Sequence, residues 1–103
     1  MSELQTRLNN FAVRVIRLCG GISKSQVGAH VVQHLLEHGT ALAPRQVEID
    51  QTSNQNLITV QQLNLQKLLV WLDIVRKSDL LPDYTLDSLR DKCEQLIELF
   101  NQS

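Results

Sequence analysis

Three histidines stand four residues apart and offer the first candidate chemistry, a metal site. His30, His34 and His38 share one face of a helix, and a histidine pair at this spacing can bind zinc or another transition metal. The three side chains together span about 12 Å, too far for all of them to share one ion. The only carboxylate among them is Glu37. We therefore expect the histidines to be structural or interfacial, with no metal and no cofactor bound. A metal site on His30 and His34 is the weaker alternative.

A second group of residues that could do chemistry is basic. Arg7, Arg14 and Arg17 fall within about a quarter turn of one another on a helix, and Lys24 follows them. Such cations can contact the phosphates of a nucleic acid. They can also form a solvated face, or pair with acidic residues near the C-terminus. These candidate partners are Asp87, Asp91, Glu94 and Glu98.

Residue types that serve covalent or acid–base catalysis are present without a recognised arrangement. Serine, threonine and aspartate are scattered with no pattern of nucleophile, base and orienting group, and no glycine-rich phosphate loop occurs. Cys19 and Cys93 have neither a CxxC nor a metal-ligand spacing. Both lie on apolar stripes, so we expect buried, reduced thiols, with a disulfide or redox role as the alternative. The sequence predicts no enzyme activity and no small-molecule substrate.

Length and charge limit the kinds of partner. The 103 residues suit a single domain, 1–103, and the net charge of −1 gives no overall attraction to nucleic acid or membrane. The charge is uneven, because residues 1–45 carry a net +3 and residues 46–103 a net −4. There is no 18-residue apolar run, and the start MSELQTRLNN lacks an apolar signal region. We expect a cytoplasmic protein without a membrane partner.

Four segments with helical apolar spacing must position these side chains. Helices are predicted over 3–19, 24–51, 55–77 and 85–101. The first is expected to end at Gly20-Gly21, a pair that supplies a positive φ, and the second to open with the capping box Ser23-x-x-Gln26. The last has the cleanest stripe, spaced three and four residues apart, which excludes a strand. It consists of Leu86, Leu89, Cys93, Leu96 and Phe100.

Pro44 falls inside the second predicted helix. It removes one backbone hydrogen bond and clashes with the preceding turn. The segment is therefore either one long helix kinked near Pro44 or two helices broken there. Val47 and Ile49 continue an apolar face beyond the proline, which favours the kink. With short connections, the sequence predicts an all-α, antiparallel up-down-up-down four-helix bundle with a long second helix kinked near Pro44.

The third predicted helix is apolar on more than one side. A helix of this kind is covered on more than one side, and a second subunit is the simplest second cover. We expect Trp71 to pack in the core or at that boundary and not to stack on nucleic-acid bases. The candidate interface residues are Leu69, Trp71, Ile74, His34 and His38.

Four segments of the chain resemble a known family. They are FAVRVIRL at 11–18, LLEHGTAL at 35–42 followed by Glu48, LLVWLDIVRKSDLL at 68–81 and CEQLIELF at 93–100. In this order they resemble the bacterial four-helix-bundle proteins first named from intervening sequences in 23S ribosomal RNA genes. The resemblance covers nearly the whole chain.

The resemblance implies a homopentameric ring of short antiparallel bundles with no established activity. It also implies that Arg14 and Glu48, which match the family's common Arg and Glu, pair structurally. A related branch comprises the accessory variability determinant proteins of diversity-generating retroelements. That branch forms a basic pentameric barrel that binds nucleic acid and a reverse transcriptase.

These observations lead to two functional hypotheses. The first is a non-enzymatic, self-assembling bundle that forms a ring-like homo-oligomer, with a pentamer favoured by the resemblance, and acts as an adaptor or scaffold for another macromolecule. The alternative is a nucleic-acid-binding accessory protein of the retroelement-associated type. Its binding residues would be Arg7, Arg14, Arg17 and Lys24, gathered around the oligomer.

Overall fold

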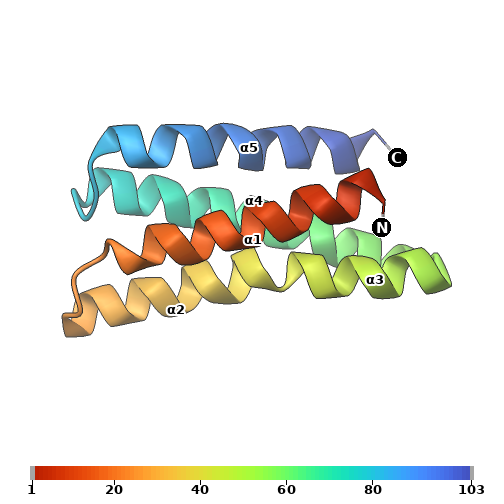
Figure 1. The fold of residues 1–103 in the computed structure, drawn as a ribbon, viewed down its shortest axis with the longest axis horizontal. Helices are drawn as coiled ribbons and strands as arrows, with labels where there is room; N and C mark the ends of the chain where they lie inside the picture. Colours follow the sequence, from red (N-terminus) through yellow and green to blue (C-terminus); the bar gives the residue numbers. More distant parts are fainter. Residues whose placement is uncertain (1, 103) are drawn as a thin grey trace.

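Helices make up most of the computed structural model, which describes residues 2–102 in a bundle measuring 40 × 22 × 22 Å (Figure 1). They are α1 (Glu3–Gly20), α2 (Gln26–Thr40), α3 (Leu42–Thr52), α4 (Gln55–Lys77) and α5 (Asp83–Asn101). The described residues include no strand, and α2 and α3 follow one another in the same direction. The predicted all-α four-helix bundle is confirmed. None of the helices described is long and apolar enough to cross a membrane.

The bundle has four positions, one of which is filled by α2 and α3 together, and each position packs against two neighbours. α1 lies beside α5 and beside the α2–α3 column, and α4 lies beside the same two. Within residues 2–102, α1 and α4 make no close backbone approach to each other and occupy opposite corners. The start of α1 and the end of α5 lie at the same end of the bundle (Figure 1).

The apolar stripes predicted from the sequence form the core. All five stripe residues of α5 are buried, as are Leu35 on α2 and Leu65 and Leu72 on α4. Because the stripes recur at helical spacing, each helix turns one face inward along its whole length. Ile16 on α1 lies outside this inward face and is 53% exposed.

The predicted long second helix is interrupted, and the interruption falls at Ala41 and not at Pro44. The structure has two helices, α2 and α3, separated by this one residue, whose φ of −74° and ψ of −21° remain helical. Pro44 has no N–H for the Thr40 carbonyl, and its ring crowds that carbonyl, so the helical ladder breaks one turn before the proline. The chain keeps its direction through this residue, so the predicted long second helix kinked near Pro44 is present, with its break three residues before the proline.

Buried glutamines hold the start of α3 after this break. Gln61, fully buried on α4, donates from Nε2 to the Leu42 carbonyl at 2.9 Å, and Gln5 on α1 donates to the Ala43 carbonyl at 2.9 Å. The Gln61 Oε1 also accepts from Arg45 at 3.0 Å. Buried amides are stable only when hydrogen-bonded, and these side chains tie α1 and α4 to the backbone of α3. We call Gln5 and Gln61 the glutamine clamp.

The ends of α1 and α2 differ from the predicted ones. Gly21 ends α1 with a φ of −87°, so the glycine pair does not supply a positive φ. Ser25, two residues after the predicted Ser23, caps α2 by accepting from the Gly28 N–H at 3.0 Å. The preceding turn folds back so closely that a Cβ on Gly28 would lie 1.9 Å from the Ser23 carbonyl oxygen. This close approach, invisible in the local sequence, fixes where α2 begins.

Candidate functional site

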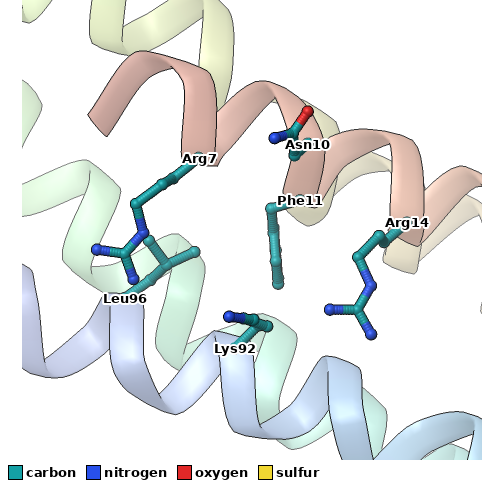
Figure 2. A pocket seen from close by; sticks show the side chains of 6 residues that line it. All are labelled: Arg7, Asn10, Phe11, Arg14, Lys92 and Leu96. Atoms are coloured by element: carbon teal, nitrogen blue, oxygen red, sulfur yellow. The ribbon is translucent and has the colours of Figure 1, made fainter. Parts of the chain in front are cut away.

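A basic groove runs between α1 and α5. It consists of two pockets that share Arg14, with volumes of about 150 and 290 Å³. The smaller pocket is shown in Figure 2 and is lined by Arg7, Asn10, Phe11, Arg14, Lys92 and Leu96. The larger is lined by Arg14, Arg17, Leu18, Gly21, Leu81, Thr85 and Leu89.

The smaller pocket has cationic walls and an apolar floor. Arg7, Phe11 and Arg14 are spaced four and three residues apart on α1, so they share one helix face. In Figure 2 the two arginines extend from α1 toward α5 on either side of Phe11, and Lys92 lies across from them, while Asn10 points away from α5. Phe11 is 3% exposed and Leu96 2% exposed, so both are fixed by the core. The cations are thus held around a small apolar surface.

The cations of the groove have no acidic partners among the described residues. Arg14 donates to the Ser88 hydroxyl at 2.7 Å, and no carboxylate described here lines either pocket. No ion pair within residues 2–102 involves Arg7, Arg17 or Lys92. The groove therefore has a local excess of positive charge on a molecule of net charge −1.

Two acidic residues of α5, Asp87 and Glu94, pair with arginines other than those of α1. Asp87 pairs with Arg76 at 2.8 Å, and Glu94 pairs with Arg90, which also binds Asp73 at 2.7 Å. The hydrogen bond and charge of Asp73, together with the charge of Glu94, raise the pKa of Arg90. The alternative that Asp87 or Glu94 neutralises the α1 arginines is therefore wrong. These pairs lie on the side of α5 that faces α4.

The structure changes the membership of the predicted basic patch. Lys24 is exposed in the connection between α1 and α2 and lines neither pocket, whereas Lys92 joins Arg7 and Arg14. Sequence reasoning missed Lys92 because α5 was read as an acidic helix. Its signal is its position four residues before the buried Leu96, on the flank of that stripe. The described partner of Arg14 is Ser88, and within residues 2–102 Arg14 forms no ion pair with Glu48.

The surface of α4 that faces away from the core carries a second candidate site. Four large aliphatic side chains and one lysine follow a spacing of three, four, three and four residues, the repeat of helix-packing seams. The aliphatic residues are 39%, 52%, 57% and 40% exposed in chain order. We call this set the outer stripe of α4: Val60, Leu63, Lys67, Val70 and Ile74.

The predicted interface residues divide between this stripe and the subunit's own packing. Ile74 belongs to the outer stripe, while Leu69 is half-buried against the core. Trp71 is half-buried and stacks on His34 of α2, with ring centroids 4.4 Å apart and planes 9° apart. His38 stacks on His34 from the next turn, with centroids 6.3 Å apart. One face of Trp71 is therefore covered within the subunit.

The three histidines do not form a multi-ligand metal centre with their surroundings. His30 meets His34 edge-on, with ring centroids 4.7 Å apart. Among the residues described, no group of three or more histidines, cysteines or acidic residues could hold a metal ion. The arrangement instead places aromatic rings of α2 over Trp71, a packing contact between α2 and α4.

Both cysteines are free and buried, as predicted. Burial raises the pKa of the Cys19 thiol to about 11. Burial, helped by the charge of Glu94, raises the pKa of the Cys93 thiol to about 12. The Cys93 Sγ also lies 3.5 Å from the Leu65 carbonyl oxygen, to which the thiol donates. Neither group is suited to act as a nucleophile near neutral pH, because the reactive species is the thiolate.

These thiols predict a loss of stability in alkali. The unfolded chain loses its thiol protons near pH 9.0, whereas the folded chain retains them up to about pH 11 and 12. The stabilising effect is therefore complete below pH 9 and is lost as the pH rises through those values. We expect the free energy of unfolding to fall by at least about 2 kcal/mol between pH 9 and 11. Urea denaturation at each pH measures this fall. The prediction would be contradicted if the unfolding free energy of a Cys19→Ala, Cys93→Ala variant fell just as steeply with pH.

Comparison with known proteins provides no relative for this chain. No family model, no curated protein and no solved structure matches it. The resemblance to the 23S rRNA intervening-sequence family therefore stays a prediction. The function must be argued from the basic groove and the outer stripe.

Proposed function

We propose that the protein is a non-enzymatic, self-assembling helical bundle that acts as an adaptor or scaffold. The observation that supports this is the outer stripe of α4. Val60, Leu63, Val70 and Ile74 expose aliphatic surface along a helix whose opposite face is already in the core. Aliphatic side chains at this spacing fit another helix, and covering them removes apolar surface from water.

A ring-shaped homo-oligomer is the form we propose for the assembly. The resemblance of the sequence to the intervening-sequence family favours a pentamer. Lys67 lies at the centre of the stripe, so two stripes packed antiparallel about that centre would bring two lysines together. A repeated head-to-tail contact, which closes into a ring, avoids this repulsion.

Light scattering after size exclusion tests the self-assembly. We expect the wild-type chain at tens of micromolar to have a mass several times 11.7 kDa. A Leu63→Glu, Val70→Glu variant should shift to 11.7 kDa, because two buried carboxylates without partners would oppose the contact.

The matched control is Val27→Glu, Val47→Glu, which alters exposed aliphatic residues on α2 and α3. It should leave the mass of the assembly unchanged. A wild-type monomer at the same concentration would contradict the proposal. It would also be contradicted if light scattering gave the same mass for the α4 double variant and for the control double variant.

Nucleic-acid binding is the second candidate, and one observation favours it. The groove cations Arg7, Arg17 and Lys92 have no ion-pair partner in the described part of the chain. Several copies in a ring would multiply this local positive charge. Phosphates could then replace the missing carboxylates.

Fluorescence anisotropy with a labelled single-stranded oligonucleotide tests this candidate. Contact with about three phosphates should give a logarithmic salt slope of about −2. An Arg14→Glu, Arg17→Glu variant should weaken binding by about 100-fold at low salt, because repulsion replaces attraction. Lys24→Glu, outside the groove, should have a much smaller effect. Binding that is absent or independent of salt would contradict this role.

A further inference from the structure

We infer that the pocket between Arg7, Arg14 and Lys92 binds one small organic anion. The ligand is a phosphate monoester or carboxylate whose apolar body is about the size of one aromatic ring. This inference goes beyond the proposed function and does not depend on self-assembly. It depends on the cations, the floor and the volume of the smaller pocket of the basic groove.

The cationic side chains on the sides of the pocket indicate that the ligand carries a negatively charged group. Two guanidinium groups and one ammonium group reach it from two different helices (Figure 2). Arg14 is held by its hydrogen bond to Ser88, which uses one Nη2 donor. Its remaining N–H groups suit the oxygen pairs of a carboxylate or phosphate. No described side chain in the lining carries a negative charge to compete with the ligand.

The apolar part of the ligand is set by the floor. Phe11 and Leu96 line the pocket with carbon atoms. Both side chains are held in place because they are packed in the core. The volume of about 150 Å³ matches cavities that accommodate a benzene ring. Inorganic phosphate would leave this floor uncovered, whereas a ring attached to the phosphate would cover it.

A compact anion fits the surroundings better than an extended polyanion. Asp91 and Glu98 are exposed on α5, the helix that carries Lys92. A nucleic-acid strand lying along α5 would have to pass these carboxylates, which repel its phosphates. A small ligand reaches the three cations without such contacts. We therefore argue for the small ligand and treat the oligonucleotide as a competing outcome of the test.

The test is a titration of ¹⁵N-labelled protein at low ionic strength with phenyl phosphate, benzoate, inorganic phosphate and a single-stranded oligonucleotide. We expect phenyl phosphate to bind about tenfold more tightly than inorganic phosphate, because only its ring covers the floor and the aliphatic stems of the lining cations. The largest amide shifts should fall near Arg7, Phe11 and Arg14 on α1 and near Lys92 on α5. Benzoate should shift the same amides.

Two charge-neutralising variants separate the pocket from general attraction. Lys92→Gln should weaken phenyl phosphate binding by about tenfold, through loss of a charged donor. Lys67→Gln removes another exposed lysine, on α4 at the corner opposite α1, and should leave the affinity unchanged. Arg7→Gln serves as a second pocket variant, and circular dichroism checks that each variant is folded.

Each of several results would overturn the inference. Equal affinity for phenyl phosphate and inorganic phosphate would show a charged surface without a pocket. A stronger preference for the oligonucleotide at the same amides would assign the groove to nucleic acid. Equal effects of Lys92→Gln and Lys67→Gln, or no saturable binding of phenyl phosphate up to about 10 mM, would also contradict it. None of these results depends on the oligomeric state.

Discussion

Replacement of Gly28 by alanine is expected to lower the free energy of unfolding by about 3 kcal/mol. The added Cβ would lie 1.9 Å from the Ser23 carbonyl oxygen, so the backbone of the preceding turn must move. That movement also disturbs the cap, in which Ser25 accepts from the Gly28 N–H. Alanine favours a helix over glycine by about 1 kcal/mol, so the clash must exceed this gain. Urea denaturation followed by circular dichroism measures the difference.

Two other glycines provide matched controls. A Cβ on Gly20 would meet nothing within 4 Å, so Gly20→Ala should be neutral or slightly stabilising. A Cβ on Gly39 would lie 2.8 Å from a methyl group of Val15, so Gly39→Ala should cost an intermediate amount, about 1–2 kcal/mol. A Gly28→Ala variant as stable as Gly20→Ala would show that the turn before α2 does not pack as described.

Replacement of Gln61 by alanine should lower the free energy of unfolding by about 3 kcal/mol. The side chain is fully buried, and its removal leaves a cavity beside α3. It also removes the hydrogen bond to the Leu42 carbonyl and leaves Arg45 without the amide oxygen it contacts at 3.0 Å. Urea denaturation measures the loss, and amide hydrogen exchange in α3 should accelerate with it.

Two variants on α4 distinguish the glutamine clamp from simple filling of space. Gln61→Leu keeps most of the volume but none of the side-chain hydrogen bonds, so it should still cost about 2 kcal/mol. Gln66→Ala removes an exposed glutamine of the same helix and should change stability by less than about 0.5 kcal/mol. If Gln61→Leu were as stable as the wild type, the amide contacts would contribute nothing measurable.

The parts of the fold that follow from local spacing could be predicted from the sequence. The bounds of α4 agree with the prediction at both ends, and the stripe from Leu86 to Phe100 is buried throughout. Both follow from the repeat of apolar residues along one helix, which depends only on near neighbours in the chain. α5 begins at Asp83, two residues earlier than predicted, because Pro82 can precede the first turn of a helix.

The parts that depend on other helices could not be predicted. The hydrogen bonds that hold the start of α3 come from glutamines on α1 and α4, which no local pattern places beside α3. The choice of Ser25 over Ser23 as the cap depends on how the turn folds against Gly28. Lys92 joins the groove because α5 packs beside α1, with Asp87 and Glu94 paired to other arginines. In each case a tertiary contact, and not the local sequence, decides the outcome.

The diagonal placement of α1 and α4 has a consequence for avidity. Since the two helices stand at opposite corners, covering the outer stripe of α4 does not by itself cover the α1–α5 groove of the same copy. Ligands tethered to one another would then engage several grooves at a high effective concentration, and weak single contacts would add to a slow overall dissociation. A monovalent probe would gain nothing from the same assembly.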